Sequence, residues 1–231
     1  MAIDITFDFR SDAGGKDPDA ASPTLRRYHQ LLWSKDLPNG TRFDLSDTNP
    51  PAYLHHSSEL GEFNLASDSV TPTFTHWKSM KTITEQFPES ENEAFRTIGY
   101  TIGAMMVFPG NKVDGKMTIN GARGFTRRIA DRFDLTLECI RRHYLEQPSP
   151  LDSVLARYRD FFALFENFDG YVTFFLLEDL VGKDGRVQFF MPFDDFRPPS
   201  APKDVVTYKE YRRLSIEFIH ARNERISNLD L

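Results

Sequence analysis

Residues 125–145, with the sequence FTRRIADRFDLTLECIRRHYL, decide the fold class of this chain. The apolar side chains within this stretch are spaced four, four, three and four residues apart: Ile129, Phe133, Leu137, Ile140 and Tyr144. One face of an α-helix has this spacing. The stretch therefore predicts a helix that buries one side against the rest of the protein.

The chain beyond this stretch also has helical features. Ser149-Pro150 is a helix-opening pair, and a second apolar stripe follows it: Leu151, Leu155, Tyr158, Phe162, Phe165 and Phe168. Residues 171–181 are apolar almost throughout, which favours a buried helix over a strand. Thr207-x-x-Glu210 is a capping box that predicts a C-terminal helix, reached through the proline-rich connector 197–202. The second half is thus predicted to be mostly helical.

The first half has the signals of short strands. Residues 3–9 alternate apolar and polar side chains, as a half-buried strand does, and further strands are predicted at 42–45, 52–56 and 61–65. Residues 100–108 and 113–119 predict a β-hairpin across a Pro-Gly-Asn turn. Helices are predicted to begin at Ser22-Pro23 and to cover roughly 74–87 and 89–95. The fold class is therefore α+β: a small, mostly antiparallel sheet from the N-terminal half, covered by helices, and a helix-rich C-terminal half, in one globular domain spanning residues 1–231.

Composition excludes several classes of protein. Apolar residues make up 40% of the chain, too many for a disordered protein. The net charge of −6 weighs against general binding of polyanions. The single cysteine, Cys139, excludes an internal disulfide and a cysteine-rich zinc site. The N-terminus lacks the pattern of a signal peptide, and the apolar runs are too short to span a bilayer. We therefore expect a cytoplasmic protein with no membrane partner.

The region from Asn120 to His143 is the strongest candidate for a binding site. A glycine-bracketed segment, residues 120–124, leads into an arginine-rich helix, and a helix start suits phosphate or carboxylate. Arg123, Arg127 and Arg128 are predicted to hold a phosphate-bearing small molecule, oriented by Asn120, with two-point guanidinium contacts. The alternative is a purely structural network, because acidic residues lie at helical spacing: Asp131, Asp134 and Glu138.

Other candidate groups have structural explanations beside the functional ones. His55 and His56 are adjacent, so in a strand they point to opposite faces, and one is a candidate acid or base. The acidic loop 8–19 is better explained as a solvated turn than as a Mg²⁺ or Ca²⁺ site, and no metal site is predicted. Cys139 and the aromatic residues 161–168 are expected to lie in the core rather than to react or to stack on bases.

Four segments resemble those of a bacterial family of uncharacterised proteins: SPTLRRYH (22–29), GARGF (121–125), DRFDLTLECIRR (131–142) and FDDF (193–196). The resemblance spans nearly the whole chain. It implies a bacterial source but no activity, cofactor or catalytic residue. Two alternatives to binding of a small anion therefore stay open. One is a protein-interaction or homo-oligomeric module that uses exposed aromatic side chains, because the chain has 21 Phe. The other is a protein acting on RNA or DNA, against which the net negative charge weighs.

Overall fold

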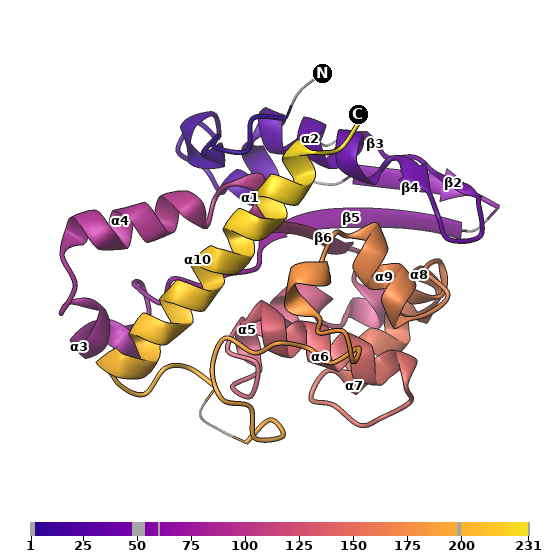
Figure 1. Cartoon of the computed structure of the whole chain (residues 1–231). Helices are drawn as coiled ribbons and strands as arrows, with labels where there is room; N and C mark the ends of the chain where they lie inside the picture. The colour runs from indigo at the N-terminus through magenta and orange to yellow at the C-terminus, as the bar shows by residue number, and fades with distance from the viewer. Residues whose placement is uncertain (1–2, 48–53, 60, 198–199, 231) are drawn as a thin grey trace.

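The computed structural model describes residues 3–47, 54–59, 61–197 and 200–230. A four-stranded antiparallel sheet lies between helices from the two halves of the chain (Figure 1). Its strands are, in spatial order, β3 (Ser46–Asp47), β4 (Leu54–Ser58), β5 (Gly61–Ser69) and β6 (Met105–Pro109). Strands β1 (Lys35–Asp36) and β2 (Arg42–Phe43) form a separate antiparallel pair. The predicted α+β class is confirmed.

Strand β5 is the longest strand, and it extends past the described end of β4. Pairing with β4 reaches Leu65, opposite Leu54, whereas pairing with β6 continues to Ser69. The carbonyl of Asn64 accepts a hydrogen bond from Gly110, so the backbone groups of even-numbered residues face β6. The backbone groups of Ser67 and Ser69 consequently face the opposite edge of the strand, where other partners must satisfy them.

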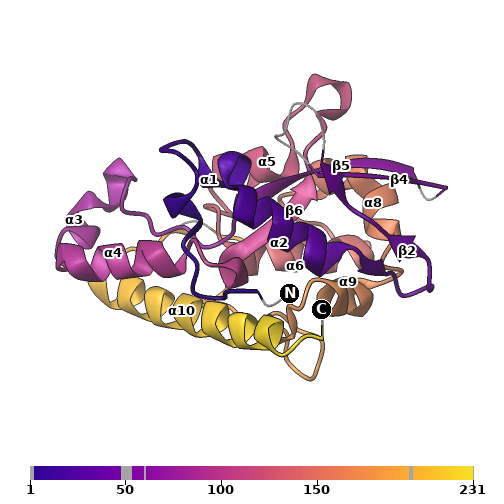
Figure 2. The same ribbon diagram turned by 90° about the horizontal axis from the view of Figure 1, so that it is seen from above.

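Helices cover both faces of this sheet (Figures 1 and 2). α2 (Pro23–Trp33) begins at the predicted cap Ser22, whose side chain accepts from the amide of Leu25, and it packs on one face. α5 (Ile119–Phe125) and α6 (Phe133–Tyr144) lie on the other face. The remaining α-helices of the described chain are α1 (Pro18–Ala21), α3 (Lys81–Thr84), α4 (Glu89–Ile98), α7 (Asp152–Leu155), α8 (Arg159–Ala163), α9 (Phe168–Phe174) and α10 (Val205–Ser227). Short 3₁₀ turns connect them: η1 (Phe9–Ser11), η2 (Lys78–Met80), η3 (Ile102–Ala104), η4 (Val113–Gly115), η5 (Ala156–Tyr158) and η6 (Glu178–Leu180).

The long helix α10 closes the outer edge of β6. The fully buried guanidinium of Arg222 donates to the carbonyls of Gly103 (2.9 Å) and Met105 (2.8 Å), and to Phe175 (3.0 Å). The side-chain oxygen of Asn223 accepts from the amide of Gly103 at 2.7 Å. Burial lowers the pKa of Arg222 to about 10, so the group stays charged at neutral pH. The edge of β6 that does not pair with β5 would otherwise expose unpaired backbone groups, and α10 covers it.

The aromatic residues of the second half form core, as predicted. The aromatic side chains of residues 161–168 are nearly inaccessible: Phe161, Phe162, Phe165 and Phe168. They pack with the rings of Tyr171, Phe174 and Phe175, which lie in α9 and at its end. Cys139 is buried too, and burial raises the pKa of its thiol to about 12. The thiol is therefore protonated at neutral pH, and the prediction of a core cysteine is confirmed.

Two predicted elements of the first half are wrong. Residues 3–9 form no strand, because the side chain of Asp4 accepts from the amide of Thr6 at 2.9 Å and turns the backbone. The predicted hairpin 100–119 also fails. β6 does precede the Pro-Gly-Asn turn, but residues 113–115 form a 3₁₀ turn and β6 pairs with β5 instead. All five residues of β6 are buried, and such a strand needs cover on both edges.

The helix predicted over residues 125–145 is broken in the middle. α5 ends at Phe125 and α6 begins at Phe133, and between them Ala130 and Asp131 have positive φ angles of 51° and 61°. Residues 171–181 are α-helical only as far as Phe174, and the 3₁₀ turn η6 follows at Glu178–Leu180. Residues 187–190 form no strand, and Val187 makes only an isolated bridge to Val181.

The predicted boundaries of several other elements also shift. Residues 74–87 contain only the short η2 and α3, and α4 extends to Ile98. The start of α10 uses Asp204 as its cap, with Thr207 at the third helical position, rather than Thr207 with Glu210. Of the connector 197–202, positions 198 and 199 lie outside the described residues, as do 48–53 before β4.

Candidate functional site

Arg123, the centre of the predicted anion site, is fully buried and already bound. Its Nε donates to Thr136 Oγ1 at 3.0 Å and its Nη2 donates to the carbonyl of Asp131 at 2.9 Å. Its guanidinium forms ion pairs with the carboxylates of Asp68 and Asp131, the second at 3.3 Å. These contacts neutralise the guanidinium from within the fold, so the alternative of a structural network describes Arg123.

The other predicted ligand residues do not gather around Arg123. Asn120 lies on α5 and donates to the carbonyl of Ser67 at 3.4 Å. The two glycines that were expected to form a loop lie inside α5. Arg127 and Arg128 are exposed in the turn after α5, and within the described residues neither has a carboxylate partner. The structure therefore divides the predicted site into a buried part and an exposed part.

Two regions that are far apart in the sequence meet beside β5. Asp19 lies on α1, in the acidic loop of the N-terminal segment, and Asp68 lies near the end of β5. Both lie close enough to Arg123 and Asp131 for their charges to interact. We call these four residues, Asp19, Asp68, Arg123 and Asp131, the Arg123 cluster. It contains three carboxylates and one guanidinium.

The excess of carboxylates changes the acidity of the cluster. Burial, reinforced by the charge of Asp17, raises the pKa of Asp19 to about 6. Burial also raises the pKa of Asp68 and of Asp131 above the usual range, and Arg123 opposes this for both. One guanidinium cannot compensate three carboxylates, so the cluster as a unit retains a proton at higher pH than isolated aspartates do. Asp68 and Asp131 keep 21% and 30% of their side-chain surface exposed, so solvent reaches the cluster.

Two buried oxygens beside the cluster have no hydrogen-bond donor. Asp19 accepts from the amide of Ser69 at 3.4 Å, and Asn120 donates to the carbonyl of Ser67; both side chains thus bind the same edge of β5. The Oδ1 atoms of Asp19 and Asn120 are both buried and have no partner. A buried acceptor without a donor costs about 1–3 kcal/mol, so two of them along one edge of β5 require an explanation.

A serine–histidine pair on the opposite face of β5 is not a catalytic dyad. His29 Nε2 lies 2.9 Å from Ser67 Oγ, and the Nδ1 of the same ring accepts from the indole Nε1–H of Trp33 at 3.0 Å. Because the indole is only a donor, the ring proton of neutral His29 must be on Nε2, which donates to Ser67. Burial lowers the pKa of His29 to about 3, and the nitrogen that faces Ser67 already carries the ring proton, so the ring is too weak a base to take the serine proton.

The two histidines predicted as acid or base also lie in structural contacts. His56 is buried, stacks on Phe43 and bonds to the carbonyl of Asp44 (2.9 Å) and to Ser58 (2.8 Å). His55 pairs with Glu62 at 3.1 Å on the other face of β4. In the described part of the chain, neither bonds to the predicted ligand residues Asn120, Arg123, Arg127 and Arg128.

The acidic loop is used for local structure. Asp8 pairs with Arg10 at 2.5 Å, and Asp12 accepts from Ser22 Oγ at 2.6 Å. Asp17 caps α1. Within the residues that the structure describes, no three histidine, cysteine or acidic side chains are placed to hold a metal ion.

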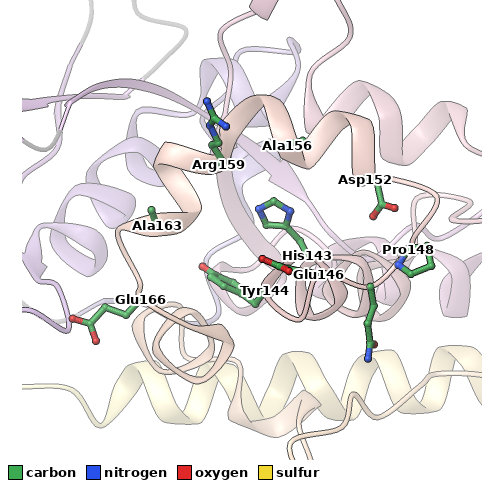
Figure 3. A pocket seen from close by; sticks show the side chains of 10 residues that line it. His143, Tyr144, Glu146, Pro148, Asp152, Ala156, Arg159, Ala163 and Glu166 are labelled. Atoms are coloured by element: carbon green, nitrogen blue, oxygen red, sulfur yellow. The ribbon is translucent and has the colours of Figure 1, made fainter.

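A groove lies between the end of α6 and the helices α7 and α8 (Figure 3). Its volume is about 630 Å³, and it is lined by His143, Tyr144, Glu146, Gln147, Pro148, Asp152, Ala156, Arg159, Ala163 and Glu166. The His143 ring lies against the ring of Phe162, with 5.2 Å between centroids. Sequence patterns did not predict this groove, because its residues come from three α-helices, the 3₁₀ turn η5 and two loops.

A match to a protein-family model shows which family the chain belongs to. The sequence model of the family of unknown function DUF6994 matches residues 3–226. The chain belongs to this family. The predicted resemblance to a family of uncharacterised proteins is thereby confirmed, and membership of DUF6994 assigns no activity or ligand. No curated protein and no solved structure matches the chain. Among the described helices, none is long and apolar enough to cross a membrane.

Proposed function

We propose that the protein binds a small primary amine at the Arg123 cluster, beside the edge of β5. The observation that carries this proposal is the imbalance of charge: three carboxylates, two of them reached by solvent, share one guanidinium. An ammonium ion supplies the missing positive charge. It also carries three N–H donors in a group about the size of a water molecule.

The two unpartnered oxygens support an ammonium ion over other cations. Asp19 Oδ1 and Asn120 Oδ1 need hydrogen-bond donors rather than charge alone. Their anchoring points on β5, Ser69 and Ser67, are two residues apart, about 7 Å along the strand. An amine whose N–H groups point toward this edge would satisfy acceptors that the fold leaves open.

Binding of a cation at this site is coupled to proton release. Carboxylates that hold a proton near neutrality lose it when a positive charge arrives, because the cation lowers their pKa. The affinity for an amine should therefore rise as the pH increases through about 6, the pKa of Asp19.

The test compares two cations at matched ionic strength. Methylammonium chloride should raise the melting temperature more than tetramethylammonium chloride, which has no N–H donor, and the difference should grow from pH 5.5 to 8. Asp19→Asn should remove the difference. Asp160→Asn, at a side chain that is 87% exposed, is the matched control and should retain it. Equal responses to the two cations in the wild-type protein would refute the proposal.

A second proposal keeps the exposed part of the predicted anion site. Arg127 and Arg128 are exposed beside Phe125, whose surface is 79% accessible, and they have no counterion among the described residues. We propose that they bind the phosphate of a small molecule by two-point contacts. Stabilisation by inorganic phosphate or nucleotides should disappear in Arg127→Ala/Arg128→Ala and persist in Arg186→Ala, at an arginine that is 82% exposed. No stabilisation of the wild-type protein would end this second proposal.

A further inference from the structure

A second cavity lies between α3 and α4, which are neighbours in Figures 1 and 2. Its walls come from the segment before η2, from α3 and the turn after it, and from α4. Its volume is about 440 Å³, within the range of small-molecule sites, roughly 300–1,000 Å³. None of the residues of the Arg123 cluster lines this cavity.

The side chain of Asn92 brings a buried, unpartnered oxygen to this cavity. Asn92 lines the cavity and is only 4% exposed. Its Nδ2 donates to the carbonyl of Thr84 at 3.1 Å, and because a carbonyl can only accept, this bond fixes which amide atom is the nitrogen. Within the described part of the chain, no donor reaches Asn92 Oδ1. A ligand that donates an N–H to this oxygen would remove the cost of leaving it unpaired.

Arg96 supplies a hydrogen-bond donor beside this acceptor. It lines the cavity four residues after Asn92 on α4, and side chains four apart lie next to each other on one face of a helix. Among the residues that the structure describes, the guanidinium bonds to Glu93 through Nε and to Glu89 through Nη2, and no group bonds to its Nη1. Glu93 is shared with Arg10, at 2.9 Å. The cavity therefore offers an acceptor and a donor side by side.

The charged groups of the lining compensate one another. The Nζ of Lys81 lies 3.4 Å from the carboxylate of Glu85, and the guanidinium of Arg96 pairs with the carboxylate of Glu89. Two cations thus face two anions, each within its own ion pair. The lining consequently favours an uncharged ligand over an ion.

An aromatic wall completes the cavity. Phe87 lines it and is held edge-on by the ring of Tyr208, with 5.2 Å between centroids, and by the guanidinium of Arg212, 4.8 Å from the ring centroid. The exposed ring of His76 also lines the cavity. Aromatic rings pack well against one another at centroid distances of about 4.5–7 Å, so a planar ring suits this wall.

From these observations we propose that the cavity binds a primary carboxamide attached to a planar ring. The C=O and one N–H of a primary amide lie on the same side of the group, so they match Arg96 and Asn92 together. In a trans peptide bond these two groups point to opposite sides, so a peptide does not present this edge. A ring lactam presents it but lacks the second N–H, which a primary carboxamide offers to the carboxylates of the lining. The proposal is independent of the Arg123 cluster.

Titration of the ¹⁵N-labelled protein with benzamide, followed by NMR chemical shifts, tests the proposal. The shifts should be confined to α3, α4 and the residues around them. N,N-dimethylbenzamide has no N–H donor, and benzoate offers only acceptors and a charge, so each should bind about tenfold more weakly, the loss expected for one unmade buried hydrogen bond. 2-Pyridone, a ring lactam, should also bind more weakly than benzamide.

Two variants test the assigned residues. Asn92→Leu removes the acceptor and should bind benzamide and N,N-dimethylbenzamide equally. Arg96→Met should weaken benzamide binding about tenfold. It removes only ion pairs at the surface, so this comparison does not depend on whether Asn92→Leu folds. The matched control is Arg213→Met on α10, whose arginine also pairs with two glutamates of its own helix and lies outside the cavity, and it should bind as the wild type does.

Several results would overturn the proposal. One is an absence of benzamide shifts around α3 and α4, and another is equal affinity of the wild-type protein for benzamide and N,N-dimethylbenzamide, because the ring alone would then explain binding. Tighter binding of 2-pyridone than of benzamide would contradict the assignment to carboxamides. Equal benzamide affinities of Arg96→Met and Arg213→Met would exclude the donor role of Arg96, and a folded Asn92→Leu that keeps the wild-type preference would exclude the acceptor role of Asn92.

Discussion

Replacement of Asp19 by asparagine should stabilise the protein, and more so as the pH rises. The pKa of Asp19 is raised from 3.8 to about 6 in the folded state. An aspartate whose pKa is raised in the folded state destabilises the fold only when it is ionised. The penalty is absent below pH 3.8, grows between pH 3.8 and 6, and is complete above about pH 6.

The size of the effect follows from the same two values. At ~1.4 kcal/mol for each factor of ten in the protonation equilibrium, the penalty is about 3 kcal/mol at pH 7. Asparagine keeps an oxygen that can accept from the amide of Ser69. Its NH₂ group would lie where the unpartnered Oδ1 now lies, close to the remaining carboxylates of the cluster.

Urea unfolding at pH 4, 5.5 and 7.5 measures this difference. The free energy of unfolding of Asp19→Asn should match that of the wild type at pH 4 and exceed it by about 2–3 kcal/mol at pH 7.5. Asp160→Asn should show no such trend. A pH-independent difference between Asp19→Asn and the wild type would refute the reasoning, because Asp19 would then titrate as an ordinary exposed aspartate does.

Four further variants or reactions test other parts of the structure. Gly103→Ala should destabilise the protein by several kcal/mol in urea titrations, because its Cβ would lie 2.5 Å from the carbonyl oxygen of Ile219. Arg222→Met should lower the free energy of unfolding by about 3–5 kcal/mol, since three carbonyls lose their donor at the edge of β6. Cys139 should stay unreactive toward a thiol reagent at pH 8 until urea unfolds the chain, because its pKa is raised to about 12 and the thiol is buried. Glu146→Gly should raise the free energy of unfolding by about 1 kcal/mol, the strain of one left-handed residue.

Local sequence patterns predicted the class of fold because most of its elements are encoded locally. The cap Ser22 before Pro23 sets the start of α2, and the aromatic stripe of residues 161–168 forms core as its spacing indicates. The errors lie where contacts distant in the sequence decide the structure. β6 pairs with a strand distant in the sequence, β5, with Ser69 opposite Met105 and Leu65 opposite Pro109, and α10 covers its other edge.

The candidate site was predicted only in part, for a similar reason. Arg123 was predicted to hold an anion, but its counterion Asp68 is 55 residues away in the sequence. The strand predicted at 61–65 ended before Asp68, whereas β5 runs to Ser69. The break at Ala130 and Asp131 also escaped prediction, because neither is glycine and the apolar spacing continues across it.

The proposed amine site requires the Arg123 cluster to hold a proton near neutral pH. A pH titration of the aspartate side-chain carboxyl carbons by NMR observes this directly. We expect at least one carboxyl to titrate with a midpoint near or above pH 6, and this transition should be altered in Asp19→Asn. If every aspartate titrates below about pH 4.5, the three carboxylates are fully compensated within the fold, and the proposed amine site is wrong.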